Sequence, residues 1–144
     1  MGRDALPFSI FKNCLKKPIR GLPNSLDRIG DHLRKRRLEL GMLQKEVADC
    51  LQVCEDSICG WEMGRSSPMI HHYPAIISFL GYNPYLSNEN SIGKRILAYR
   101  LLNGLSNKTM GKFIGVDGST ILSWESGRMK PTSKSLKKLE VLLI

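Results

Sequence analysis

Residues 44–68 read QKEVADCLQVCEDSICGWEMGRSSP, and residues 107–131 read NKTMGKFIGVDGSTILSWESGRMKP. Both stretches belong to a longer internal repeat, because residues 29–68 fall on residues 92–131 without a gap when they are shifted forward by 63 positions. Thirteen of the 40 aligned positions are identical. We expect what survives in both copies to be scaffold, and what differs to be a candidate for function. The identical pairs are Ile29/Ile92, Gly30/Gly93, Arg37/Arg100, Leu38/Leu101, Gly41/Gly104, Lys45/Lys108, Val53/Val116, Ile58/Ile121, Trp61/Trp124, Glu62/Glu125, Gly64/Gly127, Arg65/Arg128 and Pro68/Pro131.

The two copies carry the apolar spacing and the stop signals of short helices. Ser106 is a good N-cap for the second helix of the second copy, whereas Leu43, at the matching position of the first copy, is not. No strand pattern occurs, so we predict an all-α chain. The predicted helices run from Ile29 to a stop at Gly41, over 44–51, over 55–63 and from Pro74 to Leu80, and then over 92–103, 107–114, 118–126 and about 133–142.

In each copy, a tight three-residue turn joins the second and third helices, which is the pattern of a helix-turn-helix. A small residue, Ala48 or Gly111, would let these two helices cross closely. Gly115 suits a left-handed turn. Gln52, at the same place in the first copy, would be strained by roughly 1–2 kcal/mol if the turn keeps that shape. The predicted core below the crossing contains Val53/Val116, Ile58/Ile121 and Trp61/Trp124.

These residues resemble the Cro/lambda-repressor (XRE-like) type of helix-turn-helix domain, a large family of bacterial and phage regulators. The resemblance covers residues 29–81 and again 92–142. It implies an all-α fold with two tandem lambda-repressor-like domains of about four helices each. The domain boundaries that we predict are a basic N-terminal arm over 1–27, a first helix-turn-helix domain over 28–86 and a second over 87–144.

The resemblance also implies that the third helix of each copy enters the major groove of DNA. A further implication is an ion pair between an arginine of the first helix and the acid that follows the core aromatic residue. We interpret these residues as structural. They are Arg37, Glu62 and Trp61 in the first copy and Arg100, Glu125 and Trp124 in the second.

The exposed face of the third helix differs between the copies. Family geometry places Cys54, Glu55, Asp56, Cys59 and Gly60 on it in the first copy, and Asp117, Gly118, Ser119, Leu122 and Ser123 in the second, with Thr120 nearby. Neither face holds Arg, Lys, Asn or Gln, the strongest base readers. The two carboxylates of the first copy would lie near phosphates and make it a poor binder, whereas the second offers hydroxyl groups. We interpret Asp117 as a helix N-cap.

Phosphate contacts should supply most of the affinity for DNA. Family geometry puts the amides at the start of the second helix, and the lysine beside each, against the backbone. The alternative for each lysine is an ordinary solvated surface charge. The predicted DNA-binding residues are Gln44, Lys45, Glu55, Asp56 and Ser57 in the first copy, and Asn107, Lys108, Gly118, Ser119, Thr120, Ser123, Arg128 and Lys130 in the second.

The charge of the chain is strongly positive and unevenly spread. The net charge is +9 over 144 residues, which favours an acidic polymer or surface as a partner. Residues 1–27 hold five basic and two acidic residues, residues 28–90 hold seven and eight, and residues 91–144 hold ten and three. The arm over 1–27 has two open interpretations, a tail that covers apolar surface through Phe8, Ile10 and Phe11, or a phosphate-contacting segment.

Other classes of function find little support. Four cysteines without a signal peptide or a membrane-length apolar run predict a cytoplasmic protein with reduced thiols. The cysteine spacings do not fit zinc, and we expect no metal or other cofactor. No phosphate-binding glycine loop or activated nucleophile is recognisable, so we expect neither an enzyme nor a small-molecule substrate. We interpret Cys50 as a small core residue that matches Phe113, and Cys54 and Cys59 as partly exposed thiols.

These features favour sequence-specific binding of double-stranded DNA by a repressor-like transcriptional regulator, mainly through the second copy. The alternative is a protein-interaction or antitoxin-like helix-turn-helix module with weak DNA readout, which the acidic first copy favours. An RNA-binding role is less favoured, because no aromatic platform is evident. Two copies on one face of a duplex would have to lie about 34 Å apart. A homodimer that uses only the second copy therefore stays open beside a monomer that uses both.

Overall fold

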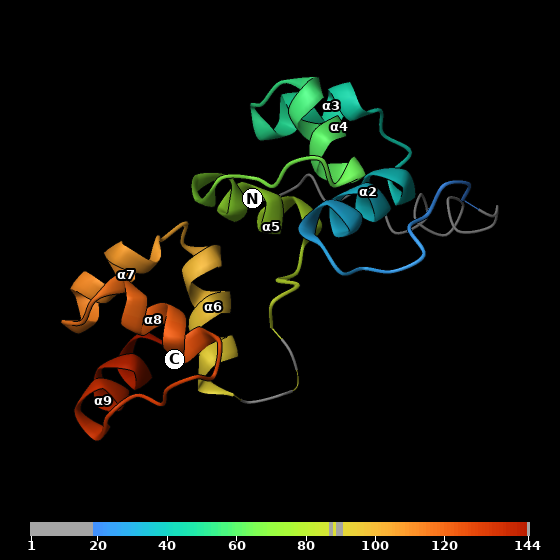
Figure 1. The fold of residues 1–144 in the computed structure, drawn as a ribbon. Coiled ribbons are helices and arrows are strands. Elements are labelled where there is room, and N and C mark those ends of the chain that lie inside the picture. Colours follow the sequence, from blue (N-terminus) through green and yellow to red (C-terminus); the bar gives the residue numbers. More distant parts are fainter. Residues whose placement is uncertain (1–18, 87, 89–90, 144) are drawn as a thin grey trace, which may run out of the picture. The chain divides into compact units, whose positions relative to one another are not determined.

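The structure is a computed structural model that describes residues 19–86, 88 and 91–143. Within these residues every regular element is a helix and no strand occurs, as predicted (Figure 1). The helices are α2 (Ile29–Glu39), α3 (Gln44–Leu51), α4 (Glu55–Met63), the short 3-10 helix η1 (Ile70–His72), α5 (Tyr73–Leu80), α6 (Ile92–Leu102), α7 (Asn107–Ile114), α8 (Gly118–Glu125) and α9 (Ser133–Leu142). Phe8, Ile10 and Phe11 of the predicted arm lie outside the described residues.

The predicted bounds of α3, α4, α7 and α9 are confirmed, and those of the other helices differ by one or two residues. Capping explains several of these bounds. The Ser106 hydroxyl accepts a hydrogen bond from the Thr109 backbone N–H at 3.1 Å, as an N-cap does. Leu43 has no such group, and the Glu46 carboxylate instead accepts from the Leu43 backbone N–H at 2.7 Å.

The chain divides into two compact units between Ser67 and Pro68. This division differs from the predicted boundary between residues 86 and 87, because α5 belongs to the second unit. There α5 packs against α6, and the Asn83 side-chain amide donates to the Ala98 carbonyl at 3.0 Å. The apolar residues of α5 thus bury their surface within the second unit. Sequence periodicity predicts the helix but cannot show to which unit it belongs.

In the first unit, α4 packs against both α2 and α3. Its core includes Leu33, Val47, Ile58 and Trp61, all of which are buried. Gly30 lies so close to the Trp61 carbonyl that a Cβ atom would overlap it. The close approach of α2 and α4 therefore explains why both copies of the repeat keep a glycine here.

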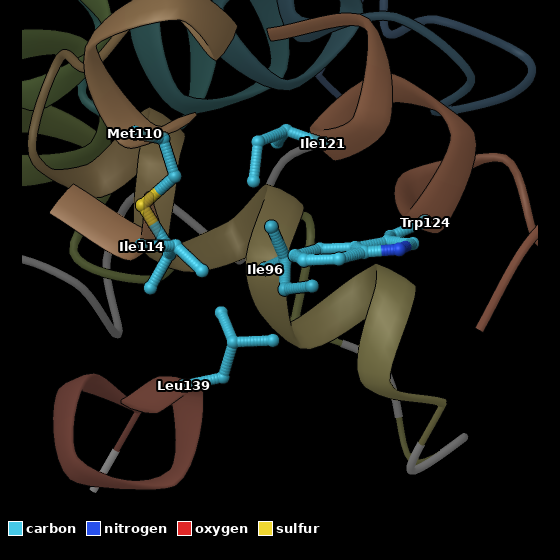
Figure 2. Close-up of a cluster of buried hydrophobic side chains, with 6 residues drawn as sticks. All are labelled: Ile96, Met110, Ile114, Ile121, Trp124 and Leu139. Carbon is cyan, nitrogen blue, oxygen red and sulfur yellow. The ribbon is translucent and has the colours of Figure 1, made fainter. Parts of the chain in front are cut away.

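The second unit has an equivalent core, which Figure 2 shows. Four helices supply its six residues, Ile96, Met110, Ile114, Ile121, Trp124 and Leu139. Each fully buried side chain of this size contributes roughly 1.5–3 kcal/mol to folding. A Cβ atom on Gly93 would likewise overlap the Trp124 carbonyl. These contacts fix α8 relative to α6 and leave the opposite side of α8 free to face solvent.

One predicted core position is wrong. Cys50 is exposed on α3, and Phe113, its counterpart on α7, is 60% exposed. Both side chains project from the outer side of their helix, one residue before the buried Leu51 and Ile114. A single apolar residue next to a buried one does not show which helix face it occupies. None of the described helices is long and apolar enough to span a membrane.

Candidate nucleic-acid interface

The interface predicted in the second unit is built on α7, a tight turn and α8. Gly115 ends α7 in the left-handed conformation, with φ at +88°. The backbone N–H of Val116 then donates to the Gly111 carbonyl at 2.9 Å and closes the turn. A Cβ atom on Gly111 would overlap the Val116 carbonyl, so the predicted need for a small residue at the crossing is explained by the structure.

The same turn in the first unit keeps this shape without glycine. Gln52 has φ of 54° and ψ of 45°, and it is the one residue other than glycine with positive φ among those that the structure describes. The Val53 N–H donates to the Ala48 carbonyl at 3.0 Å, as in the second unit. The strain predicted for Gln52 is therefore present.

A buried ion pair anchors each helix-turn-helix to its first helix. The Arg37 Nε and Nη2 atoms donate to the two Glu62 carboxylate oxygens at 2.7 and 2.8 Å, and Nη1 donates to the Met42 carbonyl at 3.0 Å. Arg100 bonds Glu125 at 2.7 and 3.1 Å and the Leu105 carbonyl at 3.0 Å. Both predicted pairs are thus present, and the hydrogen bonds to Glu62 raise the pKa of Arg37.

The amides predicted to grip phosphates have another partner in the structure. The Asn107 amide nitrogen donates to the Glu125 carboxylate at 3.3 Å, and that of Gln44 donates to Glu62 at 2.9 Å. Each amide therefore extends the ion pair and helps to fix the start of α7 or α3 on α8 or α4. The sequence held no separate signal for this role, because an amide at the start of a helix suits a phosphate as well as a buried acid.

The outer face of α8 is made mostly of small residues. Ser119 and Leu122 are exposed, and Gly118, Thr120 and Ser123 are half-buried. Asp117 occupies the N-cap position as predicted, although its side chain makes no capping hydrogen bond and stays exposed. This face has the low relief that allows a helix to approach a groove closely.

Exposed basic side chains precede and follow α8 in the chain of the second unit. Lys108 is exposed at the start of α7, and Arg128 and Lys130 are exposed in the segment that follows α8. Lys112, which is not among the predicted DNA-binding residues, is also exposed on α7. The structure therefore leaves the three predicted cations accessible to a polyanion.

The corresponding face of the first unit is acidic. Glu46, Asp49, Glu55 and Asp56 are all exposed on α3 and α4, with Lys45 as the basic residue beside them. Gly60, which was predicted to lie on the exposed face, is buried. The Ser66 hydroxyl lies 2.7 Å from the place of its missing Cβ.

The thiols on α4 have polar neighbours within this unit. The Cys54 sulfur lies 3.0 Å from the Ser57 hydroxyl, and the hydrogen bond from this hydroxyl, with one from the Ser57 backbone, lowers the pKa of the exposed Cys54 thiol. Arg65 donates to the half-buried Cys59 sulfur at 3.1 Å. Among the described residues, no group of three or more His, Cys, Asp or Glu side chains could hold a metal ion.

The close crossing of α7 and α8, the left-handed turn and the buried ion pair define a helix-turn-helix domain. Residues 96–143 match the model of the helix-turn-helix family, and this part of the chain belongs to that family in its Cro/C1-type form. No curated protein and no solved structure matches the chain. The match supports a DNA-binding helix-turn-helix regulator in general, and the family implies binding to double-stranded DNA.

Proposed function

We propose that the chain regulates transcription in a repressor-like manner by binding a specific duplex sequence, mainly through α7 and α8 of the second unit. The observation that carries this proposal is the exposed face of α8, made mostly of small side chains, together with the exposed cations Lys108 on α7 and Arg128 and Lys130 after α8. Small side chains on most of this face let the helix approach the groove, and binding to the backbone needs accessible positive charge.

In this proposal the two repeats form tandem helix-turn-helix domains with different duties, and the protein acts in the cytoplasm. The side chains of Ser119 and Thr120 contact base edges or phosphates, and Ser123, whose hydroxyl donates to the Ser119 carbonyl, can only accept from a base edge. Gly118 allows close approach. Arg128 and Lys130 hold the next phosphates. Asn107 and Gln44 contribute through the position of Lys108 and Lys45, because their amide nitrogens bond the buried acids.

A second function is favoured for the first unit by the four exposed carboxylates at 46, 49, 55 and 56. Phosphates would be repelled by such a surface, so we infer that it contacts a protein. A second copy of the chain and an unrelated basic protein are both consistent with this charge. The predicted contacts of Glu55, Asp56 and Ser57 with DNA are then weak or absent.

The test is selection of bound sequences from a random duplex pool by the full-length protein. We expect enrichment of a defined motif. A palindromic motif would support a homodimer, and two unlike half-sites would support readout by both repeats. No enrichment, together with binding that does not depend on salt, would refute the proposed function.

The repeat supplies matched variants for the division of labour. Lys108→Ala and Arg128→Ala should each weaken binding of the selected duplex several-fold, whereas Lys45→Ala and Arg65→Ala, at the equivalent positions, should leave it within about twofold. Equal losses from both pairs would show that the first repeat binds DNA as well.

A further inference from the structure

We propose that Leu122 reads the C5-methyl group of a thymine and is the main source of base discrimination in the second repeat. The inference rests on the proposed function, because it requires α8 to enter the major groove. It adds a chemical class of target, a site with an obligatory thymine, and a residue that the predicted set did not contain.

The position of Leu122 on α8 is the first argument. Ser119, Leu122 and Ser126 are exposed at intervals of three and four residues, so they form one stripe along the helix. Leu122 lies in the middle of this stripe and is 56% exposed. It is also the longest side chain there, and in a groove it would reach furthest toward the base edges.

The hydrogen bonds of the neighbouring serines are the second argument. The Ser123 hydroxyl donates to the Ser119 carbonyl at 3.0 Å, and the Ser126 hydroxyl donates to the Ser123 carbonyl at 3.2 Å. Both hydroxyl hydrogens are therefore engaged within the helix. These serines retain acceptor lone pairs but lose their donor, and donors are what the N7 and O6 or O4 atoms of base edges require.

The chemistry of the groove supplies the third argument. An apolar side chain has one kind of apolar partner on a major-groove base edge, the thymine C5-methyl. The start of α8 is held firmly, because the place of a Cβ on Gly118 is only 2.9 Å from the Lys108 backbone nitrogen. Leu122 is thus presented from a fixed helix rather than from a mobile loop.

The experiment uses the full-length protein and the duplex motif obtained from the random pool. Each thymine of the motif is replaced in turn by uracil, which keeps base pairing and lacks the methyl group. We expect at least one replacement to lower the affinity of the wild-type protein for the duplex about fourfold, which is the effect of one buried methyl group. For Leu122→Ala, the same replacement should have no effect.

The matched control is Val141→Ala, because Val141 is also apolar and 72% exposed but lies on α9. This variant should respond to uracil as the wild type does. Leu122→Ala should remain folded by circular dichroism, since Leu122 is more than half exposed and alanine favours a helix.

Two outcomes separate the inference from the proposed function. A motif without a fixed thymine, or equal affinity of the wild type for thymine and uracil at every position, would overturn the role of Leu122 while sequence-specific binding stands. A response to uracil that persists in Leu122→Ala would do the same. Failure of the pool to yield any motif would refute both.

Discussion

At the scale of single residues, the two buried ion pairs are the positions where loss of one partner should most lower the free energy of unfolding. The side chains of Arg100 and Glu125 are 10% and 6% exposed, so removal of either leaves a buried charge without its partner. We expect Glu125→Gln to lower the free energy of unfolding by about 3 kcal/mol, measured by urea denaturation.

The surface pair Lys35–Glu39 provides the control for this prediction. Its atoms are 3.8 Å apart and both side chains are more than a quarter exposed, so Glu39→Gln should cost less than about 1 kcal/mol. The double variant Arg100→Met/Glu125→Leu should be less destabilised than Glu125→Gln. A larger loss in the double variant would contradict the assignment of the cost to an unpaired charge.

The Cys54 thiol gives a prediction about pH. Because the Ser57 hydroxyl and backbone N–H stabilise the thiolate, the pKa of Cys54 is lowered and the reactive form is present at lower pH than in an ordinary thiol. The rate of alkylation of Cys54, followed by peptide mass spectrometry, should therefore rise at a lower pH than in Ser57→Ala. Ser57→Thr, which keeps a hydroxyl, should restore the wild-type profile. An identical pH profile for Ser57→Ala would refute the role of this hydrogen bond.

At the scale of elements, the two turns form a natural comparison between glycine and glutamine in one backbone conformation. Gln52 and Gly115 both have left-handed φ values, 54° and 88°. We expect Gln52→Gly to raise the free energy of unfolding by up to about 1 kcal/mol, because strain is relieved and the greater freedom of the unfolded chain offsets part of the gain.

The reciprocal variant Gly115→Gln should lower the free energy of unfolding by roughly 1–2 kcal/mol, because glutamine is strained in the left-handed conformation. No steric clash should add to this cost, because the nearest atom to the place of the new Cβ is Lys138 Nζ, at 3.5 Å. Chemical denaturation of both variants measures these changes. Destabilisation by Gln52→Gly would mean that the glutamine side chain contributes more than its backbone costs.

The helices themselves could be predicted from the sequence, and the partners of their polar residues largely could not. Apolar spacing indicates all three helices α3, α4 and α7, and a glycine stop ends α4 and α7, because these signals act within a single turn. The placement of α5 with the second unit depends on packing between elements distant in sequence. In the same way, an amide at the start of a helix suits a phosphate as well as a buried acid, and only the fold shows that Asn107 turns to Glu125. The sequence thus predicted the candidate DNA-facing helix but not the partners of all the polar residues near it.

At the scale of the whole molecule, charge separates the two repeats. Residues 28–90 hold one more acid than base, and residues 91–144 hold seven more bases than acids. The logarithm of the DNA-binding constant should fall linearly with the logarithm of salt concentration, with a slope of about −0.9 for each neutralised phosphate. The double variant Lys108→Ala/Arg128→Ala should make this slope shallower by about 2, as measured by fluorescence anisotropy.

The equivalent double variant Lys45→Ala/Arg65→Ala is the control for the salt experiment, and its slope should stay unchanged. The lysines of α9 offer a second comparison, because Lys134 and Lys137 are exposed outside the helix-turn-helix. If Lys108→Ala/Arg128→Ala and Lys45→Ala/Arg65→Ala changed the slope equally, the long-range attraction of a basic chain would explain the result better than local phosphate contacts.

Because of Gly118 at the start of α8, exposed residues can be grafted from α8 onto α4 but not from α4 onto α8. The residues at 118, 119 and 122 of α8 could replace those at 55, 56 and 59 of α4, because each of these substitutions in α4 changes an exposed or half-buried side chain. The reverse graft fails at its first position, since glutamate at 118 would drive its Cβ into the Lys108 backbone. An engineer could therefore place the α8 pattern on the acidic repeat, whereas the second repeat could not take on the acidic pattern without moving α7.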